Sequence, residues 1–218
     1  MVSSEPVESA AKRLGVLLFP GFELLDVFGP LEMFGVLRHF GEVSVEITIV
    51  AKEAGAVTSD PGLEVLADSG YADCPPLDMI LVPGGLGTRE AVSDQALVTW
   101  LYERAEVAET VMTVCTGTQL LAATGLIDGM RATTNKAFFS TIAEGRPQVD
   151  WVKEARWVEA GKFVTSSGVS AGMDMALSVI ADMAGAEVAE GIALVTEYEW
   201  HRDPSWDPFA AKHGLVGG

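Results

Sequence analysis

The chain has 218 residues, of which 49% are hydrophobic and 21% are charged, proportions that favour a compact globular protein over a disordered one. Its 14 Lys and Arg residues against 31 Asp and Glu residues give a formal net charge of -17, which repels nucleic acid phosphates and anionic lipid surfaces. We therefore expect neither nucleic acid nor a membrane as a partner.

The ends of the chain set the expected domain organisation. The N-terminus "MVSSEPVESAAKR" is polar and acidic, whereas a signal peptide needs a basic start and an apolar stretch. No apolar run reaches the roughly 20 residues that a membrane-spanning helix requires. We expect a flexible leader over residues 1–12, one domain over 13–200 and a C-terminal tail over 201–218, in a cytoplasmic protein. Cys74 and Cys115 are expected to be free thiols.

The first third of the chain alternates strand and helix patterns. "RLGVLLF", Arg13 to Phe19, is a short apolar run that predicts a strand buried on both faces. From Phe22 to Leu37 the apolar residues recur every three or four positions, which predicts an amphipathic helix. Pro30 should kink or restart that helix. The segments "VSVEITIVAK", "LEVLAD" and "DMILVPGG" predict further strands.

In the middle of the chain a cysteine stands between a strand pattern and a helix pattern. A helix is predicted from Ser93 to Ala105, with Ser93 or Asp94 as its N-cap. The next apolar run, Thr110 to Val114, predicts a buried strand. Cys115 follows directly, and "GTQLLAATGLIDG" then predicts a short helix that glycine ends.

The C-terminal half completes the fold class. "ARWVEAGKFVTSSG" predicts a hairpin that turns over Glu159–Gly161, and "SAGMDMALSVIADMAG" predicts a helix with one apolar stripe. A last helix is expected from Ala186 to Tyr198. Strands that alternate with helices predict an α/β fold, a three-layer sandwich with a mostly parallel central sheet. Ligands of such folds gather at the carboxyl ends of the strands.

Three segments are expected to meet at that edge of the sheet: Phe19–Gly21, Pro83–Gly85 and Cys115–Gly117. A cysteine at the start of a helix lies near backbone N–H groups and the positive end of the helix dipole, which lowers the thiol pKa. A nucleophilic serine occupies the same kind of turn in hydrolases. The adjacent glycines allow backbone N–H groups to approach a developing negative charge. The alternative is that Cys115 is a small buried apolar residue. Cys74, in the loop "ADCPP", is expected to be structural.

A cysteine nucleophile needs a group that manages its proton. The histidines, His39, His201 and His213, do not lie near a predicted strand end. Glu23 and Asp26 follow the first strand, and a carboxyl group close to a thiol can carry its proton. For both residues a helix-capping or surface role is the alternative.

At these residues the sequence resembles the ThiJ/PfpI superfamily, which has the class I glutamine amidotransferase-like, flavodoxin-like fold. The resemblance covers about residues 12 to 200 and rests on "GVLLFPGFELLDVFGP", "ADCPPLDMILVPGG", "VCTGTQLLAATGLIDGMRATT" and "VTSSGVSAGMDMALSVI". It implies that Cys115 is the nucleophile and that Asp26, four residues before Pro30, is its carboxyl partner. Aspartate at this position, together with "VCTG", resembles the isonitrile hydratase branch, whereas the deglycase and glyoxalase-like members carry glutamate there.

The resemblance implies an enzyme that adds water to an isocyanide, a small-molecule electrophile, to give an N-substituted formamide, with no cofactor and no metal. Backbone N–H groups of Gly85, Leu86 and Thr116 are expected to bind the developing negative charge. A homodimer is expected from the resemblance and from aromatic residues of the tail, which are types favoured in interfaces; these are Trp200, Trp206 and Phe209.

The sequence departs from the branch after "ATT", where Asn135-Lys136 stands in place of the usual histidine. That departure disfavours a protease and leaves the substrate of the hydratase open. Two rival functions are considered. One is a glyoxalase or deglycase acting on 2-oxoaldehydes, against which the aspartate counts. The other is a redox-sensing or chaperone-like protein whose Cys115 is oxidised to a sulfinate. Regulators of this superfamily carry an added DNA-binding domain, and we expect none here because the sequence ends at Gly218.

Overall fold

Six strands form the central sheet of the computed structural model, which describes residues 11–40 and 43–217. The spatial order is β2-β1-β5-β6-β10-β9. Neighbours from β2 to β10 are parallel, and only the edge strand β9 is antiparallel to its neighbour. The bounds are β1 Lys12–Leu17, β2 Val45–Val50, β5 Met79–Val82, β6 Thr110–Thr113, β9 Trp157–Ala160 and β10 Phe163–Ser166. This confirms the mostly parallel sheet.

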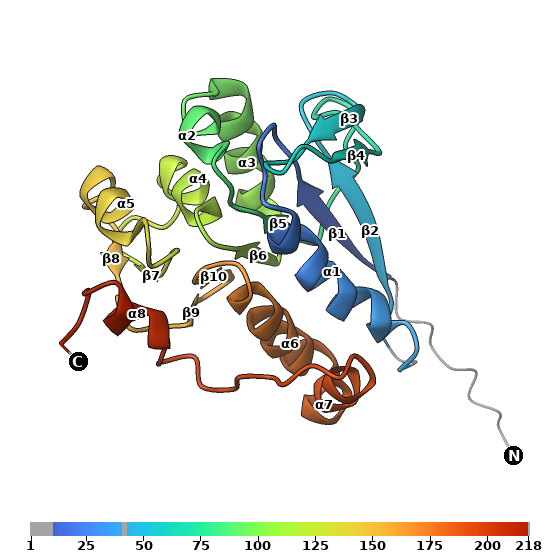
Figure 1. Ribbon diagram of the computed structural model, residues 1–218. Helices are drawn as coiled ribbons and strands as arrows, with labels where there is room; N and C mark the ends of the chain where they lie inside the picture. Colours follow the sequence, from blue (N-terminus) through green and yellow to red (C-terminus); the bar gives the residue numbers. More distant parts are fainter. Residues whose placement is uncertain (1–10, 41–42, 218) are drawn as a thin grey trace, which may run out of the picture.

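Helices cover both faces of the sheet (Figure 1). One layer contains α1 (Leu24–Leu37), α6 (Ala171–Ala184) and α7 (Ala186–Val195), which pack against one another. The opposite layer contains α2 (Thr88–Ala91), α3 (Gln95–Val107) and α4 (Gly117–Ala123). The molecule is therefore the α/β sandwich that the alternating pattern predicts.

Several short elements lie outside this frame. Two small sheets pair β3 with β4 and β7 with β8, and two short helices, α5 and α8, lie near the second of them (Figure 1). Only β4 matches a predicted strand, "LEVLAD". The bounds are β3 Gly55–Thr58, β4 Glu64–Ala67, β7 Arg131–Ala132, β8 Asp150–Trp151, α5 Phe139–Gly145 and α8 Pro208–Lys212.

Helix α1 corrects one expectation from the sequence. It continues through Pro30 and does not restart there. The proline is buried against α6: a Cβ atom added to Gly172 would lie 3.3 Å from the Pro30 ring. Because α1 and α6 pack so closely, tertiary packing offsets the backbone hydrogen bond that a proline inside a helix removes.

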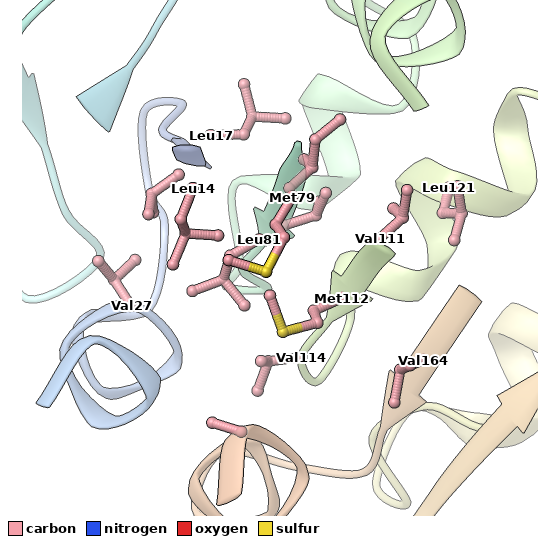
Figure 2. Close-up of a cluster of buried hydrophobic side chains, with 14 of the residues drawn as sticks. Leu14, Leu17, Val27, Met79, Leu81, Val111, Met112, Val114, Leu121 and Val164 are labelled. Atoms are coloured by element: carbon pink, nitrogen blue, oxygen red, sulfur yellow. The ribbon is translucent and has the colours of Figure 1, made fainter. Parts of the chain in front are cut away.

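The core fills the space between the sheet and both helix layers (Figure 2). Val27 of α1 approaches from one side and Leu121 of α4 from the other, with Met79, Val111 and Met112 of the sheet between them. All five side chains are at most 2% exposed. Burial of apolar surface on this scale is the main favourable contribution to folding.

No helix in the described part of the chain is long and apolar enough to span a bilayer.

The two ends differ from the expected boundaries. Residues 1–10 of the expected leader lie outside the described residues, and β1 begins at Lys12, which was assigned to that leader. At the other end, residues 201–217 pack against the domain. Arg156 N–H donates to Pro204 O at 2.8 Å, and Asp207 N–H donates to Glu154 O at 2.6 Å. Trp200, expected at a dimer interface, donates its indole N–H to Asp174 O of the same chain at 3.2 Å.

Candidate active site

Cys115 occupies a tight turn between β6 and α4. Its φ of 58° lies in the left-handed region, which costs a non-glycine residue on the order of 1 kcal/mol or more and persists only where the surroundings enforce it. The surroundings hold both backbone groups: Cys115 N–H donates to Ser167 O at 3.0 Å, and the Thr134 hydroxyl donates to Cys115 O at 2.8 Å. The turn is therefore fixed from β10 and from the segment after β7.

Asp26 approaches the same point from α1. Its side chain is fully buried, and Oδ2 accepts a hydrogen bond from Gly84 N–H at 2.8 Å. Oδ1 is buried and has no hydrogen-bond partner among the described residues. A Cβ atom on Gly84 would lie 2.9 Å from Asp26 Oδ2 and 2.6 Å from Thr116 N. Only glycine allows the strand end of β5 to pass between the carboxyl group and the Cys115 turn.

The two acidic groups strongly influence each other. Burial is the largest cause that raises the pKa of Asp26 to about 7, and the nearby Glu23 charge adds to it. Burial and the Asp26 charge raise the pKa of the Cys115 thiol to about 12. The sequence led us to expect a lowered thiol pKa, and that expectation is wrong because desolvation and the neighbouring carboxylate outweigh the N–H groups of the turn. The pair loses its first proton near neutral pH and keeps the second.

Asn135 contacts the sulfur directly. Its Nδ2 donates to Cys115 Sγ at 3.1 Å, while Oδ1 accepts from Ala137 N–H at 2.9 Å and from Phe138 N–H at 3.3 Å. The two backbone donors define which end of the amide faces the sulfur. The sequence marked this position as a departure from the usual histidine but did not assign it to the site. An amide cannot accept the thiol proton, so it acts here only as a neutral donor.

Two backbone N–H groups also reach the sulfur. Those of Thr116 and Val169 both lower the pKa of the Cys115 thiol, although less than burial raises it. Val169 lies in the loop between β10 and α6 and has a φ of 36°. Sequence reasoning missed this loop, and the only available signal was the motif "SSGVSAG" within the family resemblance. Three donors from three separate segments thus surround the Cys115 sulfur.

The three N–H groups expected to bind negative charge have different partners. Gly85 N–H donates to the Thr116 hydroxyl at 3.0 Å, so it is already used. Thr116 N–H acts on the sulfur of Cys115. No acceptor for the Leu86 N–H is found within residues 11–40 and 43–217. Leu86 is therefore the member of the set whose backbone donor is available to a ligand.

The remaining candidates lie apart from the sulfur. Glu23 acts on the site through its charge, which adds to the raised pKa of Asp26, and its backbone N–H donates to Gly84 O at 2.8 Å. His39 and His201 bond elsewhere, to Arg38 and to Asp174. Cys74 is buried, 6% exposed, and unpaired. No group of three His, Cys, Asp or Glu side chains suited to a metal ion occurs in the described ranges.

Two cavities open near the carboxyl ends of the strands. The larger, about 600 Å³, lies beside β1, β2 and α3 and is not lined by Cys115 or Asp26. The smaller, about 390 Å³, is lined by residues next to the reactive turn. They include Leu86, Arg89, Thr116, Gln119, Phe138 and Ile142. We call this smaller space the Arg89 cavity. Like the larger cavity, it is not lined by Cys115 or Asp26, and it adjoins the reactive turn through Gly85 and Thr116.

Comparisons with known proteins agree with the observed fold. The model of the DJ-1/PfpI family matches residues 12–182. A Pseudomonas putida protein named isonitrile hydratase is 34% identical over 189 residues, which cover 86% of this chain and 79% of that protein. The crystal structure of a ThiJ/PfpI family protein from Pseudomonas syringae has a TM-score of 0.79 at 32% identity, covering 88% of this chain and 77% of the other.

A second kind of relative carries a different name. The HTH-type transcriptional regulator GbdR of Pseudomonas aeruginosa is 27% identical over 195 residues, which cover 89% of this chain and 53% of the regulator. The relatives of this chain therefore include a named enzyme and a named regulator of transcription.

Proposed function

Because the chain belongs to the DJ-1/PfpI family, we propose that it is a cysteine-dependent hydratase that adds water to an isocyanide and releases an N-substituted formamide. The observation that carries the proposal is the buried pair of Cys115 and Asp26, whose carboxyl group has a pKa of about 7. A carboxyl group with a pKa near the working pH can both take and give a proton. The relative named isonitrile hydratase supports this choice of reaction.

The first chemical step forms a carbon–sulfur bond. The Asp26 carboxylate takes the thiol proton as the Cys115 sulfur attacks the terminal carbon of the isocyanide. The carbon then receives that proton from Asp26, which gives a thioimidate in which carbon is bonded to sulfur, hydrogen and the substituted nitrogen. The step consumes one isocyanide and one thiol, and Asp26 is a carboxylate again at its end.

The second step releases the product. Asp26 takes a proton from water while the water oxygen attacks the thioimidate carbon, and it passes that proton to the substituted nitrogen. Collapse of this intermediate breaks the carbon–sulfur bond, the hydroxyl proton passes through Asp26 to the sulfur, and a formamide leaves. Isocyanide plus water gives formamide, with no oxidant, reductant or cofactor in the balance.

The donors around the sulfur have defined parts in this scheme. Asn135 Nδ2 and the N–H groups of Thr116 and Val169 stabilise the sulfur as it gains negative charge. The Leu86 N–H is available to the nitrogen or oxygen of the bound intermediate. The Gly85 N–H donates to the Thr116 hydroxyl and is not available to the substrate, so Gly85 contributes by positioning that hydroxyl.

Further parts of the proposal concern the whole protein. We propose that it is cytoplasmic, that it uses no metal, and that residues 13–200 form the catalytic domain, with 201–218 as a tail of which residues 201–217 fold onto it. We also propose a homodimer whose partners are two copies of this chain. Binding to nucleic acid or a membrane is not part of the proposed function, since the chain carries a net charge of -17.

One set of assays separates the proposed reaction from its rivals. The purified protein is incubated with phenyl isocyanide, with methylglyoxal and with dilute hydrogen peroxide, and products and intact mass are measured by mass spectrometry. Formation of N-phenylformamide supports the hydratase. Lactate without formamide would instead support a glyoxalase. A Cys115 that gains two oxygens while neither substrate turns over would support the redox-sensing protein.

Matched variants connect the result to the site. Cys115→Ala removes the nucleophile and should abolish formamide production. Cys74→Ala removes the other buried thiol, which lies outside the site, and should keep turnover within about twofold of wild type. Equal loss in both variants would show that a folding defect, and not the chemistry of Cys115, accounts for the result.

A further inference from the structure

The Arg89 cavity differs in charge from the rest of the molecule. Acidic residues outnumber basic ones by 31 to 14 in the chain, yet no Asp or Glu lines this cavity and Arg89 is its one basic residue. The larger cavity follows the general composition, because it is lined by three acidic residues, Glu53, Glu90 and Asp94, and by Lys52, which pairs with Asp94. The Arg89 cavity is thus lined by one cation and by no acidic side chain.

The wall of the cavity begins one side chain away from the sulfur. Asn135 bonds to Cys115 Sγ through Nδ2 and to the backbone N–H of Phe138 through Oδ1. Phe138 then forms an apolar wall together with Leu86 and Ile142. Phe138 is 37% exposed and Leu86 is 49% exposed, so both present apolar surface to a ligand. A flat apolar group therefore fits between the reactive turn and the mouth of the cavity.

Arg89 is held at this wall. Its guanidinium carbon lies 5.6 Å from the centroid of the Phe138 ring, a distance at which a cation is attracted to an aromatic face. Among the described residues, no carboxylate lies within 4.0 Å of the Arg89 guanidinium group. The ion pairs of these residues all involve other basic side chains. A guanidinium group presents a planar fork of donors that matches one carboxylate group. Within residues 11–40 and 43–217 this donor set has no acidic partner.

We propose that the Arg89 cavity selects an electrophile that carries a carboxylate on an apolar spacer. The carboxylate pairs with Arg89, the spacer lies against Phe138 and Leu86, and the reactive carbon reaches Cys115. The inference rests on the proposed function and deepens it, since it names isocyano carboxylates, such as 4-isocyanobenzoate, as the preferred class of isocyanide. Gln119 supplies a neutral side-chain amide on the same cavity, which suits a polar substituent next to the carboxylate.

The first test compares two substrates that differ only in charge. We expect kcat/KM for 4-isocyanobenzoate to exceed that for its methyl ester by about 10- to 100-fold, the scale of a hydrogen-bonded charge pair. Arg89→Gln should reduce this ratio to near one, mainly through KM. Arg38→Gln, which removes an arginine near the end of α1, should leave the ratio unchanged. A wild-type ratio near one, or an unchanged ratio in Arg89→Gln, would overturn the inference.

The second test does not depend on turnover. Binding of 4-formamidobenzoate and of its methyl ester is measured by isothermal titration calorimetry with the wild-type and Arg89→Gln proteins. Tighter binding of the carboxylate, lost in Arg89→Gln, supports the anion-selective cavity even if no isocyanide is hydrated. Hydration of both isocyanides without any preference in rate or binding would leave the proposed function intact and refute the carboxylate site.

Discussion

At the Cys115 sulfur, three N–H donors and one carboxyl group meet in a largely buried space. The donors are Asn135 Nδ2 and the N–H groups of Thr116 and Val169. The thiol nevertheless has a pKa raised to about 12, because the donors do not replace the solvation that burial removes. The cysteine is therefore not a free thiolate that waits for a substrate. It needs a base at the moment of attack, and Asp26 is the group in position.

The pH dependence of hydration tests this requirement. Below about pH 7 the Asp26 carboxyl group is protonated, since its pKa is raised to about 7, and it cannot accept the thiol proton. We expect kcat/KM to rise with pH through about 7 and then to level off. Asp26→Asn should abolish this step in the profile and lower turnover about 100-fold or more. Initial rates from pH 5 to 9 with a neutral aryl isocyanide measure both effects.

The length of the carboxyl side chain provides the matched comparison. Asp26→Glu restores the acid but moves it by one methylene, and a shift of about 1 Å can cost about 100-fold. A pH step that persists in Asp26→Glu, at reduced rate, assigns the step to the carboxyl group. An Asp26→Asn enzyme that hydrates isocyanide at the wild-type rate would instead mean that Asp26 is structural.

Asp26 should also lower the stability of the folded protein. Its pKa rises from about 4 in the unfolded chain to about 7 in the fold, so the folded state holds the proton more tightly. Below pH 4 both states are protonated and no penalty exists. Between pH 4 and 7 the penalty grows, and above pH 7 it reaches at most about 4 kcal/mol.

We therefore expect Asp26→Asn to be more stable than wild type by about 1 to 4 kcal/mol at pH 8, with the difference vanishing near pH 4. Urea unfolding at several pH values measures this free energy. A constant difference across the pH range would contradict the assignment, because it would reflect packing and not ionisation. Loss of activity together with gain of stability is what a functional buried acid produces.

At the scale of elements, one buried acid of α6, Asp174, contacts the segment that leads into the tail. Asp174 pairs with Arg156 at 2.6 Å and accepts from the Tyr198 hydroxyl at 3.0 Å and from His201 N–H at 2.9 Å. Arg156 is 7% exposed and Asp174 is fully buried. Removal of one charge leaves the other buried and unpaired, which is more costly than the loss of an exposed ion pair.

Asp174→Asn should therefore destabilise the protein by about 3 to 5 kcal/mol and expose the tail around residues 198–207 to protease. Tyr198→Phe removes a single hydrogen bond to a charged group and should cost about 1.5 to 3 kcal/mol. Urea unfolding and limited trypsin digestion with mass mapping measure the two effects. Equal stability of Asp174→Asn and wild type would show that the other contacts of the tail hold it without the buried charge pair.

The elements that the sequence predicted share one property. Buried strands such as β5 and β6, and periodic helices such as α3 and α6, carry their signal in their own residues. Asp94 caps α3 by accepting from Ala96 N–H and Leu97 N–H, as one of the two predicted caps. Short elements were missed, because α2, α5, β7 and β8 are only two to seven residues long and depend on tertiary contacts.

The site residues show the same difference between local sequence signals and tertiary contacts. Motifs indicated Cys115 and Asp26, since both belong to local patterns at the strand ends. The part of Asn135 was not predictable, because it requires a side chain 20 residues away to be oriented by the turn at Ala137 and Phe138. The direction of the thiol pKa was predicted wrongly, because a sequence indicates the start of a helix but not how completely the turn is buried.

At the scale of the whole molecule, the net charge opposes dimerisation, whereas exposed aromatic residues favour it. Trp206 is 54% exposed and Phe209 is 44% exposed, and both lie on the tail that folds over the domain. Trp200, the third expected interface residue, is occupied by its own chain. The interface that we propose is therefore built on α8 and the segment before it. Two copies that each carry a net charge of -17 repel one another unless salt screens them.

These opposing effects predict a dimer whose affinity rises with salt. At about 0.15 M salt the screening length is about 8 Å, so apolar contact through Trp206 and Phe209 should exceed the repulsion and give a mass of twice 23.1 kDa. Light scattering at micromolar concentration, in about 0.02 M and 0.15 M salt, measures this mass.

Trp206→Ala with Phe209→Ala should shift the protein toward monomer at both salt concentrations, because the apolar contact area is lost. Leu194→Ala, which truncates a side chain 79% exposed on α7, is the matched control and should leave the dimer intact. A monomer at every salt concentration would refute the homodimer, and dissociation caused by Leu194→Ala alone would place the interface on α7 and away from the tail.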